Sequence, residues 1–152
     1  KKVKGSNSRK KAKLELARFH RRISNLRSDF HWKLADRLVS EYDIICLETL
    51  NTKAMQQMWG RKIGDLAFAE FVKVLSVMCK KHNRKLAQIN QWEATSKTCS
   101  RCGHKEKEMP LNIRKWTCPE CGEVHDRDIN AAKNILRVGA STLWRGSIRP
   151  TP

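Results

Sequence analysis

Residues 98–136 read TCSRCGHKEKEMPLNIRKWTCPECGEVHDRDINAAKNIL, a stretch that contains two Cys-x-x-Cys pairs. Fifteen residues separate the pairs, a spacing typical of zinc sites. Two thiolates three positions apart in a tight turn can occupy two corners of a tetrahedron, and the second pair supplies the other two. Four protein ligands leave no open position, so the pattern predicts a structural Zn²⁺ site. The predicted ligands are Cys99, Cys102, Cys118 and Cys121.

The alternative for the same cysteines is a pair of disulfides, which an intracellular chain disfavours. A glycine follows each pair, Gly103 and Gly122, at the point where such turns need a residue that tolerates a positive φ. His104 and His125 are close enough in sequence to reach the metal. Because four cysteines already fill the site, we expect these histidines on the surface or against nucleic acid.

Composition indicates the partner. The chain has 152 residues and a formal charge of +17, from 32 basic and 15 acidic side chains. A chain this basic most often binds a polyanion, and nucleic acid is the usual one. No apolar run approaches the roughly 18 residues of a membrane span, and the N-terminal residues lack a signal-peptide core. We therefore expect a soluble, cytoplasmic protein with no membrane partner.

The basic charge is concentrated near the N-terminus, where residues 1–37 carry 13 Lys or Arg and three acidic residues. Apolar residues recur there every three or four positions and predict one long helix over 9–41 with a single apolar stripe. The stripe is Ile23, Leu26, Phe30, Leu34 and Leu38. A basic helix can follow a phosphate backbone, although a simply solvated outer face gives the same pattern. The predicted phosphate contacts are Lys11, Arg18, Arg22 and Arg27.

The remaining pattern alternates strands and helices. It predicts a strand over 44–48, an irregular loop over 51–64, a helix over 65–83 and a second strand over 85–90. A last helix begins near Asp128 and is expected to end at Gly139, followed by a tail without a regular element. This order is typical of an α/β fold. Since two strands do not make a complete sheet, either a further strand is hidden or the chain is part of a larger fold.

Two carboxylates stand at the ends of these elements. Glu48 closes the first strand in the stretch CLETLN, and Asp128 opens the last helix. Asp126 and Asp128 have a simple explanation, because acidic side chains cap exposed N–H groups at a helix start. The functional alternative places Asp128 over the end of the strand that carries Glu48. There the two side chains would hold Mg²⁺ or Mn²⁺ through oxygen ligands and support phosphodiester hydrolysis.

Four stretches resemble the C-terminal half of TnpB, the OrfB-type RNA-guided nuclease of bacterial transposons and a relative of compact type V CRISPR effectors. They are GSNSRKKAKLELARFHRRISNLRSDFHWKLADRLVSEYD, ICLETLNTKAM, SKTCSRCGHKE…WTCPECGEVHDRDINAAKNIL and GASTLWRGSIRP. The resemblance implies a partial RNase H-like (RuvC) fold that lacks its first strands and contains an inserted zinc ribbon. It divides the chain into a RuvC-like part with the basic helix (1–94), the ribbon (95–124), a closing helix (125–138) and a C-terminal tail (139–152).

The same resemblance implies guide-RNA-directed cutting of DNA, with Glu48 and Asp128 as the second and third catalytic acids. Guide RNA and DNA would be the partners, together with the missing N-terminal half of the nuclease. The first catalytic Asp has no counterpart in this chain, so activity of the chain alone is left open. Asp43 lies at the far end of the strand from Glu48, about 17 Å away, and is excluded as a substitute. Asp65 and Glu93 do not match the family pattern.

Two other interpretations remain beside the nuclease. A non-catalytic module would bind DNA or RNA through the ribbon and the basic helix, with steep salt dependence and no requirement for magnesium. A truncated transposon remnant would have no selected function and would fold poorly.

Overall fold

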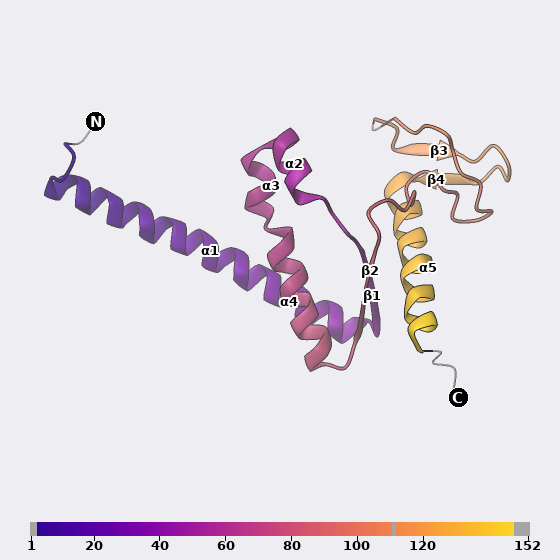
Figure 1. Ribbon diagram of the computed structural model, residues 1–152, viewed down its shortest axis with the longest axis horizontal. Helices are drawn as coiled ribbons and strands as arrows, with labels where there is room; N and C mark the ends of the chain where they lie inside the picture. The colour runs from indigo at the N-terminus through magenta and orange to yellow at the C-terminus, as the bar shows by residue number, and fades with distance from the viewer. Residues whose placement is uncertain (1–2, 111, 148–152) are drawn as a thin grey trace.

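A computed structural model describes residues 3–110 and 112–147 of the chain. Its elements are α1 (Asn7–Glu41), β1 (Ile44–Glu48), α2 (Thr52–Trp59), α3 (Arg61–Leu66), α4 (Phe68–Lys81), β2 (Lys85–Ile89), β3 (Lys115–Thr117), β4 (Val124–Asp126) and α5 (Arg127–Ser147). In Figure 1, α1 and α4 lie on one side of the β1–β2 pair and α5 lies on the other. The short strands β3 and β4 lie at the N-terminal end of α5.

The α/β class and both predicted strands are confirmed. β1 and β2 pair in parallel, with Ile44 opposite Lys85 and Glu48 opposite Ile89. The β3–β4 hairpin was not predicted and forms a separate antiparallel sheet. Within the described residues the parallel sheet has two strands. Parallel pairing requires a crossover connection, which α2, α3 and α4 supply.

The hydrophobic core lies where α1 and α4 pack on this sheet. It is made of Ala35, Val39, Ile45, Val74, Leu75, Met78 and Cys79. Side chains alternate between the two faces of a strand, and Ile45 of β1 points to the face that packs on α1 and α4. The core thereby fixes β1, and with it the position of Glu48 at the end of the strand.

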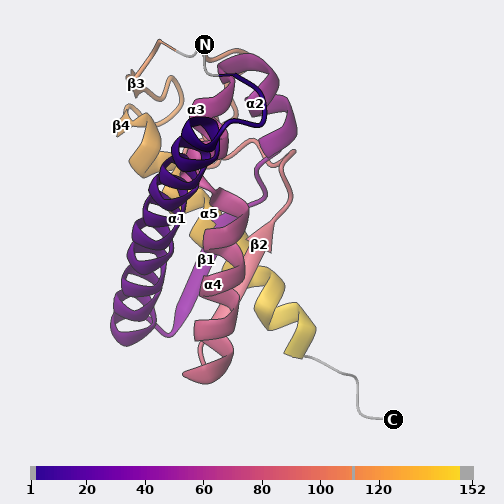
Figure 2. The ribbon, with the colours of Figure 1, turned by 90° about the vertical axis from the view of Figure 1, so that its left-hand side faces the viewer.

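The long basic helix is confirmed, but its predicted apolar stripe is wrong as a core face. Ser6 caps α1 by accepting a hydrogen bond from the Arg9 N–H at 3.3 Å. The buried residues of α1 are His31, Ala35 and Val39. Ile23, Leu26 and Phe30 are exposed, and Leu34 and Leu38 are only half-buried. The reason is that α4 covers only the C-terminal part of α1 (Figure 1 and Figure 2), so the earlier turns of α1 have no packing partner among the described residues.

The expected irregular loop over 51–64 is wrong, because most of it is helical. Asn51 caps α2 by accepting from the Ala54 N–H at 3.1 Å, and Gly60 separates α2 from α3 at φ +63°. Ala67, at φ +48°, then divides α3 from α4, so the predicted helix over 65–83 is two helices.

The expected end of the last helix at Gly139 is also wrong, since α5 continues to Ser147. Gly139 lies where α5 comes closest to β1. A Cβ at this position would lie 2.6 Å from Cys46 Sγ and 3.5 Å from Ala87 Cβ. The glycine therefore serves helix–sheet packing instead of helix termination. Residues 148–152 of the predicted tail lie outside the described residues. None of the described helices has the length and apolar composition to cross a bilayer.

Candidate metal centre and carboxylate site

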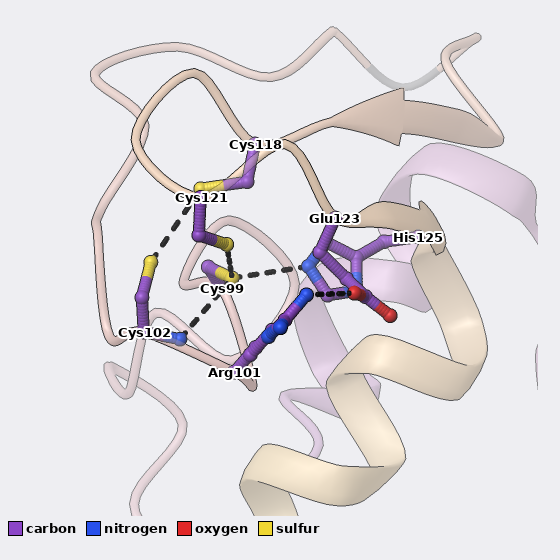
Figure 3. Close-up of polar contacts among 7 residues, drawn as sticks. All are labelled: Cys99, Arg101, Cys102, Cys118, Cys121, Glu123 and His125. Atoms are coloured by element: carbon purple, nitrogen blue, oxygen red, sulfur yellow. Dashed lines mark hydrogen bonds and ion pairs between the residues drawn. The ribbon is translucent and has the colours of Figure 1, made fainter.

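The four predicted cysteines come together. Their Sγ atoms all lie within 4.8 Å of one another, with 3.7 Å between Cys99 and Cys121 and 3.6 Å between Cys102 and Cys118. A Zn²⁺ about 2.3 Å from four sulfurs in a tetrahedron requires sulfurs about 3.8 Å apart. The spacing is too long for disulfides, and all four cysteines are free thiols. The site therefore fits a tetrahedral metal ion such as zinc (Figure 3).

Two similar turns present these sulfurs. In the first, the Gly103 N–H donates to the Cys99 carbonyl at 2.9 Å. In the second, the Gly122 N–H donates to the Cys118 carbonyl at the same distance. Gly103 and Gly122 have φ of +82° and +69°, as their positions after each pair predict. An ion pair between Arg101 and Glu123, with 2.7 Å between Nη1 and Oε2, joins the two turns.

A histidine next to the sulfurs was misplaced by the sequence analysis. His125 is buried, with 5% of its surface exposed, and its Nε2 lies 3.0 Å from Cys99 Sγ. The Trp116 ring packs on it, with 4.7 Å between ring centroids. His125 therefore contacts the predicted ligand Cys99 without being one of the four ligands. Such outer-shell contacts orient the ligands of a metal site. His104 lies 3.6 Å from Glu106 and 3.7 Å from Glu120 and is partly exposed.

The thiols differ in acidity. Burial opposes ionisation of Cys99, but hydrogen bonds from the Cys102 backbone N–H and the His125 side chain outweigh it and lower its pKa to about 5. At Cys102 the His104 backbone N–H favours the thiolate, but burial and the neighbouring thiols together raise the pKa to about 12. Four thiolates this close repel one another, so a bound dication is needed for all four to ionise.

Two buried asparagines attach this ribbon to α5. Asn130 is 1% exposed, accepts from the Ser100 N–H at 2.9 Å and donates to the Thr98 carbonyl at 2.8 Å. Asn134, one turn later, donates to the carbonyls of Thr98 at 2.6 Å and Thr95 at 2.8 Å. Positions four apart share one helix face, so the DINAAKN segment presents both amides to the ribbon. Sequence reasoning missed this role because the partners are backbone carbonyls more than thirty residues away.

The start of α5 settles which aspartate caps the helix. Asp126 Oδ1 accepts from the N–H groups of Asp128 at 3.0 Å and Ile129 at 3.1 Å. Asp126 is therefore the N-cap of α5, so helix capping is the correct explanation for this aspartate. Asp128 is not used in this way. Its side chain is 77% exposed and lies 3.5 Å from Arg114 Nη1, a solvent-exposed pair that contributes little to stability.

Glu48 is exposed at the carboxyl end of β1, as predicted. It borders a mainly apolar groove of about 500 Å³, which Leu50, Phe68 and Phe71 also line. The next residue is fixed, because the backbone N–H and Oγ1 of Thr49 both donate to the Ile89 carbonyl, at 3.0 and 2.8 Å. The Glu48 carboxylate is thus attached to a strand end that hydrogen bonds hold in place, and it is exposed to solvent.

Periodicity relates the two carboxylates. Asp128 and Gly139 are eleven residues apart, about three helical turns, so they share the face of α5 that contacts β1. Glu48 and Cys46 are two residues apart and share a face of the strand. Gly139 lies against Cys46, so periodicity places Asp128 and Glu48 at positions on the sides of α5 and β1 that face each other. In Figure 1 the N-terminal end of α5 lies toward the end of β1 that leads to α2. Asp128 lies about 16 Å along the helix from the Gly139 contact, and Glu48 about 7 Å along the strand from Cys46.

The geometry does not test whether these two side chains share a metal, which stays a prediction. In residues 3–110 and 112–147, the cysteines form the one group of three or more His, Cys, Asp or Glu close enough to hold an ion. Among the other acids considered, Asp43 forms an exposed ion pair with Arg84. Asp65 lines a separate hollow beside Gly60 and Gly64, and Glu93 is exposed.

The predicted phosphate-binding side chains lie on α1. Lys11, Arg18 and Arg22 are exposed and, at spacings of seven and four, share one helix face. Arg27 is half-buried and lies four residues before His31, which contacts Phe71 of α4. It therefore does not share the face of the other three. Contact of these four side chains with phosphate stays a prediction.

Comparison with known proteins identifies the class. Residues 1–58 match a family model described as probable transposase (OrfB_IS605), and residues 68–135 match one described as Cas12f1-like, TNB domain. A Streptomyces pristinaespiralis protein named "Putative RNA-guided DNA endonuclease" is 43% identical over 152 residues, 98% of this chain and 38% of that protein. TnpB-like protein L79 of Acanthamoeba polyphaga mimivirus is 38% identical over 149 residues, 91% of this chain and 28% of its own.

A solved structure agrees at the level of the fold. The Cas12f1 chain in a cryo-EM structure of a Cas12f1-sgRNA-target DNA complex aligns with a TM-score of 0.58 and 22% identity, over 81% of this chain and 36% of that chain. The chain spans about a third of the length of the relatives it matches. The fold is thus shared with a segment of the Cas12f1 chain. The chain belongs to the TnpB (OrfB) family, which is related to Cas12 proteins.

Proposed function

We propose that this chain is the part of an RNA-guided DNA endonuclease that carries two of the three RuvC carboxylates and a structural zinc ribbon. Glu48 and Asp128 would be ligands of Mg²⁺ or Mn²⁺, which when bound supplies Lewis-acid activation for phosphodiester hydrolysis. The observation that supports this most is that Asp126 caps α5, which leaves the Asp128 carboxylate exposed and without a capping role.

In this proposal each element has a separate task. The end of β1 holds Glu48, α5 holds Asp128, and the ribbon is fixed to α5 through Asn130 and Asn134. The basic face of α1 would hold the phosphates of guide RNA or DNA. The relatives are named RNA-guided DNA endonucleases, and the structural neighbour is a complex with guide RNA and target DNA. A further polypeptide segment would supply the first Asp and the remaining strands of a RuvC domain.

Cleavage with matched variants tests this proposal. Glu48→Ala and Asp128→Ala should each abolish Mg²⁺- or Mn²⁺-dependent DNA cutting, with the chain alone and with a segment that supplies the first Asp. Asp43→Asn is the control, because this carboxylate lies at the opposite end of the same strand. Its exposed pair with Arg84 contributes at most about 1 kcal/mol, so the variant should fold and cut normally. Undiminished cutting by the Glu48 or Asp128 variant would refute the assignment.

Two observations favour a second candidate, a module that binds nucleic acid without cutting it. Among the described residues, the four cysteines form the one group of three or more possible metal ligands that lie close together. A Pelobacter propionicus relative, 28% identical over 141 residues, is named CRISPR-associated DNA-binding protein Cas12m. Such a module should bind DNA or RNA without added Mg²⁺ or Mn²⁺, and with steep salt dependence. The absence of cutting even when the first Asp is supplied would favour this candidate over the nuclease.

A further inference from the structure

Trp92 is the most exposed large apolar side chain among the described residues. Its exposed fraction is 82%, although tryptophan rings are usually largely buried. A tryptophan ring can be used either for core packing or for stacking on a base. The structure excludes packing within the described part of the chain. An exposed indole has a large apolar surface that binding can cover.

The backbone that carries this ring is well ordered. The Trp92 N–H donates to Asn90 Oδ1 at 3.0 Å, and the Glu93 N–H donates to the Asn90 carbonyl at 3.2 Å. The Thr95 N–H then donates to the Glu93 carbonyl at 2.8 Å. These bonds form a tight turn with the ring outside it. The turn therefore presents the indole in a defined place.

That place is between the two elements that carry the carboxylates. Ile89, three residues before Trp92, is the register partner of Glu48. Thr95, three residues after it, accepts hydrogen bonds from Asn134 and Asn130 of α5, the helix that begins at Arg127 and carries Asp128. Three residues span at most about 11 Å, so Trp92 lies within that distance of both anchor points.

We propose that Trp92 stacks on a base of a single-stranded nucleic acid and so positions that strand beside Glu48 and Asp128. This inference rests on the proposed function and adds to it a residue that positions the strand. An aromatic ring can stack on any base whose face is free, which holds for single strands and not for bases inside a duplex. The net charge of +17 favours a nucleic acid over an acidic peptide as the occupant, because the strand also supplies the apolar base faces.

Binding in a buffer without added Mg²⁺ or Mn²⁺ separates this proposal from the question of cutting, and no chelator is used, so that the ribbon keeps its zinc. The probe is a fluorescein-labelled single-stranded DNA of about 20 nucleotides, longer than the roughly 4–16 nucleotides of a typical single-strand site, with its duplex as the comparison. Trp92→Ala should weaken single-strand binding roughly 5- to 150-fold, and duplex binding less than twofold. Trp92→Phe should retain most of the affinity because its ring still stacks. Because Trp92 is exposed, both variants should have the same circular dichroism spectrum as the native chain.

Two readouts distinguish stacking from a structural role. Unlabelled single-stranded DNA should quench tryptophan fluorescence in the native chain, and Trp92→Phe should lose most of this quenching. Trp32→Ala is the matched control, since it removes an exposed indole from α1. It should leave the quenching by Trp92 in place.

Equal single-strand affinity of the native chain and Trp92→Ala would overturn the proposal. So would an equal loss for single strand and duplex, or an effect limited to oligomeric state or to assembly with another polypeptide, which would mean that Trp92 covers a protein surface. A Trp92-dependent single-strand preference, with no metal-dependent cutting even when the first Asp is supplied, would support the stacking role and contradict the nuclease proposal. The two failures are therefore distinguishable.

Discussion

Substitution of Gly139 by alanine tests the contact that sets the position of α5 on the sheet. The added Cβ would lie 2.6 Å from Cys46 Sγ and 2.8 Å from Cys46 Cβ. The first distance is 0.8 Å inside the 3.4 Å at which ordinary van der Waals contact begins. Rotation of the Cys46 side chain relieves only the Sγ contact, because Cβ is fixed to the strand. Either α5 or β1 must move.

The expected magnitude follows from two opposing terms. Overpacking of this kind costs typically about 1–3 kcal/mol, and contact with an immobile Cβ favours the upper part of that range. Alanine gains about 1 kcal/mol over glycine inside a helix. We therefore expect Gly139→Ala to lower the free energy of unfolding by about 2 kcal/mol. Metal-dependent cutting should fall too, because the same contact holds Asp128 relative to Glu48.

Gly64→Ala is the matched control. Gly64 is also helical, but a Cβ there would meet only Gln56 Nε2, at 3.5 Å. This variant should keep the propensity gain without the steric cost and be as stable as the native chain or up to about 1 kcal/mol more stable. Urea denaturation followed by circular dichroism measures both. If Gly139→Ala proved as stable as Gly64→Ala, the inferred close contact between α5 and β1 would be incorrect. Combining Gly139→Ala with Cys46→Ala should recover part of the loss, since it removes the Sγ contact.

Three further predictions concern the ribbon and the basic helix. Asn130→Ala should destabilise the protein by about 1–3 kcal/mol because it leaves the Ser100 N–H without its partner; thermal unfolding measures this, and a neutral effect would contradict the anchoring role. The pKa of Cys99 is lowered from its ordinary value, so its contribution to the stability of the metal-free ribbon is present above pH 9 and declines as the pH falls, until it is lost below about 5. Protons compete with metal for the same thiolates, so zinc, followed with a colorimetric chelator, should be released on acidification, and retention of the metal at pH 4 would argue against thiolate ligation. Arg18→Ala should weaken DNA binding and reduce the slope of log affinity against log salt by about 1, whereas the half-buried Arg27 should change the slope less.

Local patterns were sufficient for some parts of the fold. The Cys-x-x-Cys pairs and their glycines specified the ribbon turns, since ligand geometry and positive φ are local requirements. The apolar run before Glu48 specified a strand. The stripe on α1 misled because periodicity reports which residues are apolar and not how far the neighbouring helix extends. Exposed Ile23, Leu26 and Phe30 show that a good stripe can remain uncovered within the described chain.

The errors at glycines have a common physical origin. A glycine breaks a helix when its φ is positive, as at Gly60, but it also permits close approach inside a helix, as at Gly139. The sequence around each residue does not distinguish these uses, because the deciding atom, Cys46 Sγ, is more than ninety residues from Gly139. The role of His125 was missed for a related reason. Four cysteines completed the ligand set, and the chain gave no sign that a fifth side chain would support one of them.

Helix α5 connects the four-cysteine site to the proposed carboxylate site, so a structural zinc would affect the proposed cutting without taking part in it. One face of the helix holds the ribbon through Asn130 and Asn134, and another contacts β1 through Gly139. Asp128 lies at the N-terminal end of α5, next to the ribbon. Loss of the metal should therefore release the carbonyls that Asn130 and Asn134 bind, loosen the first turns of α5 and displace Asp128, while β1 and Glu48 keep their place in the core. Chelation should then reduce hydrogen-exchange protection at the start of α5 and leave β1 protected. Equal loss of protection in both elements would mean that the ribbon stabilises the whole fold and not the helix alone.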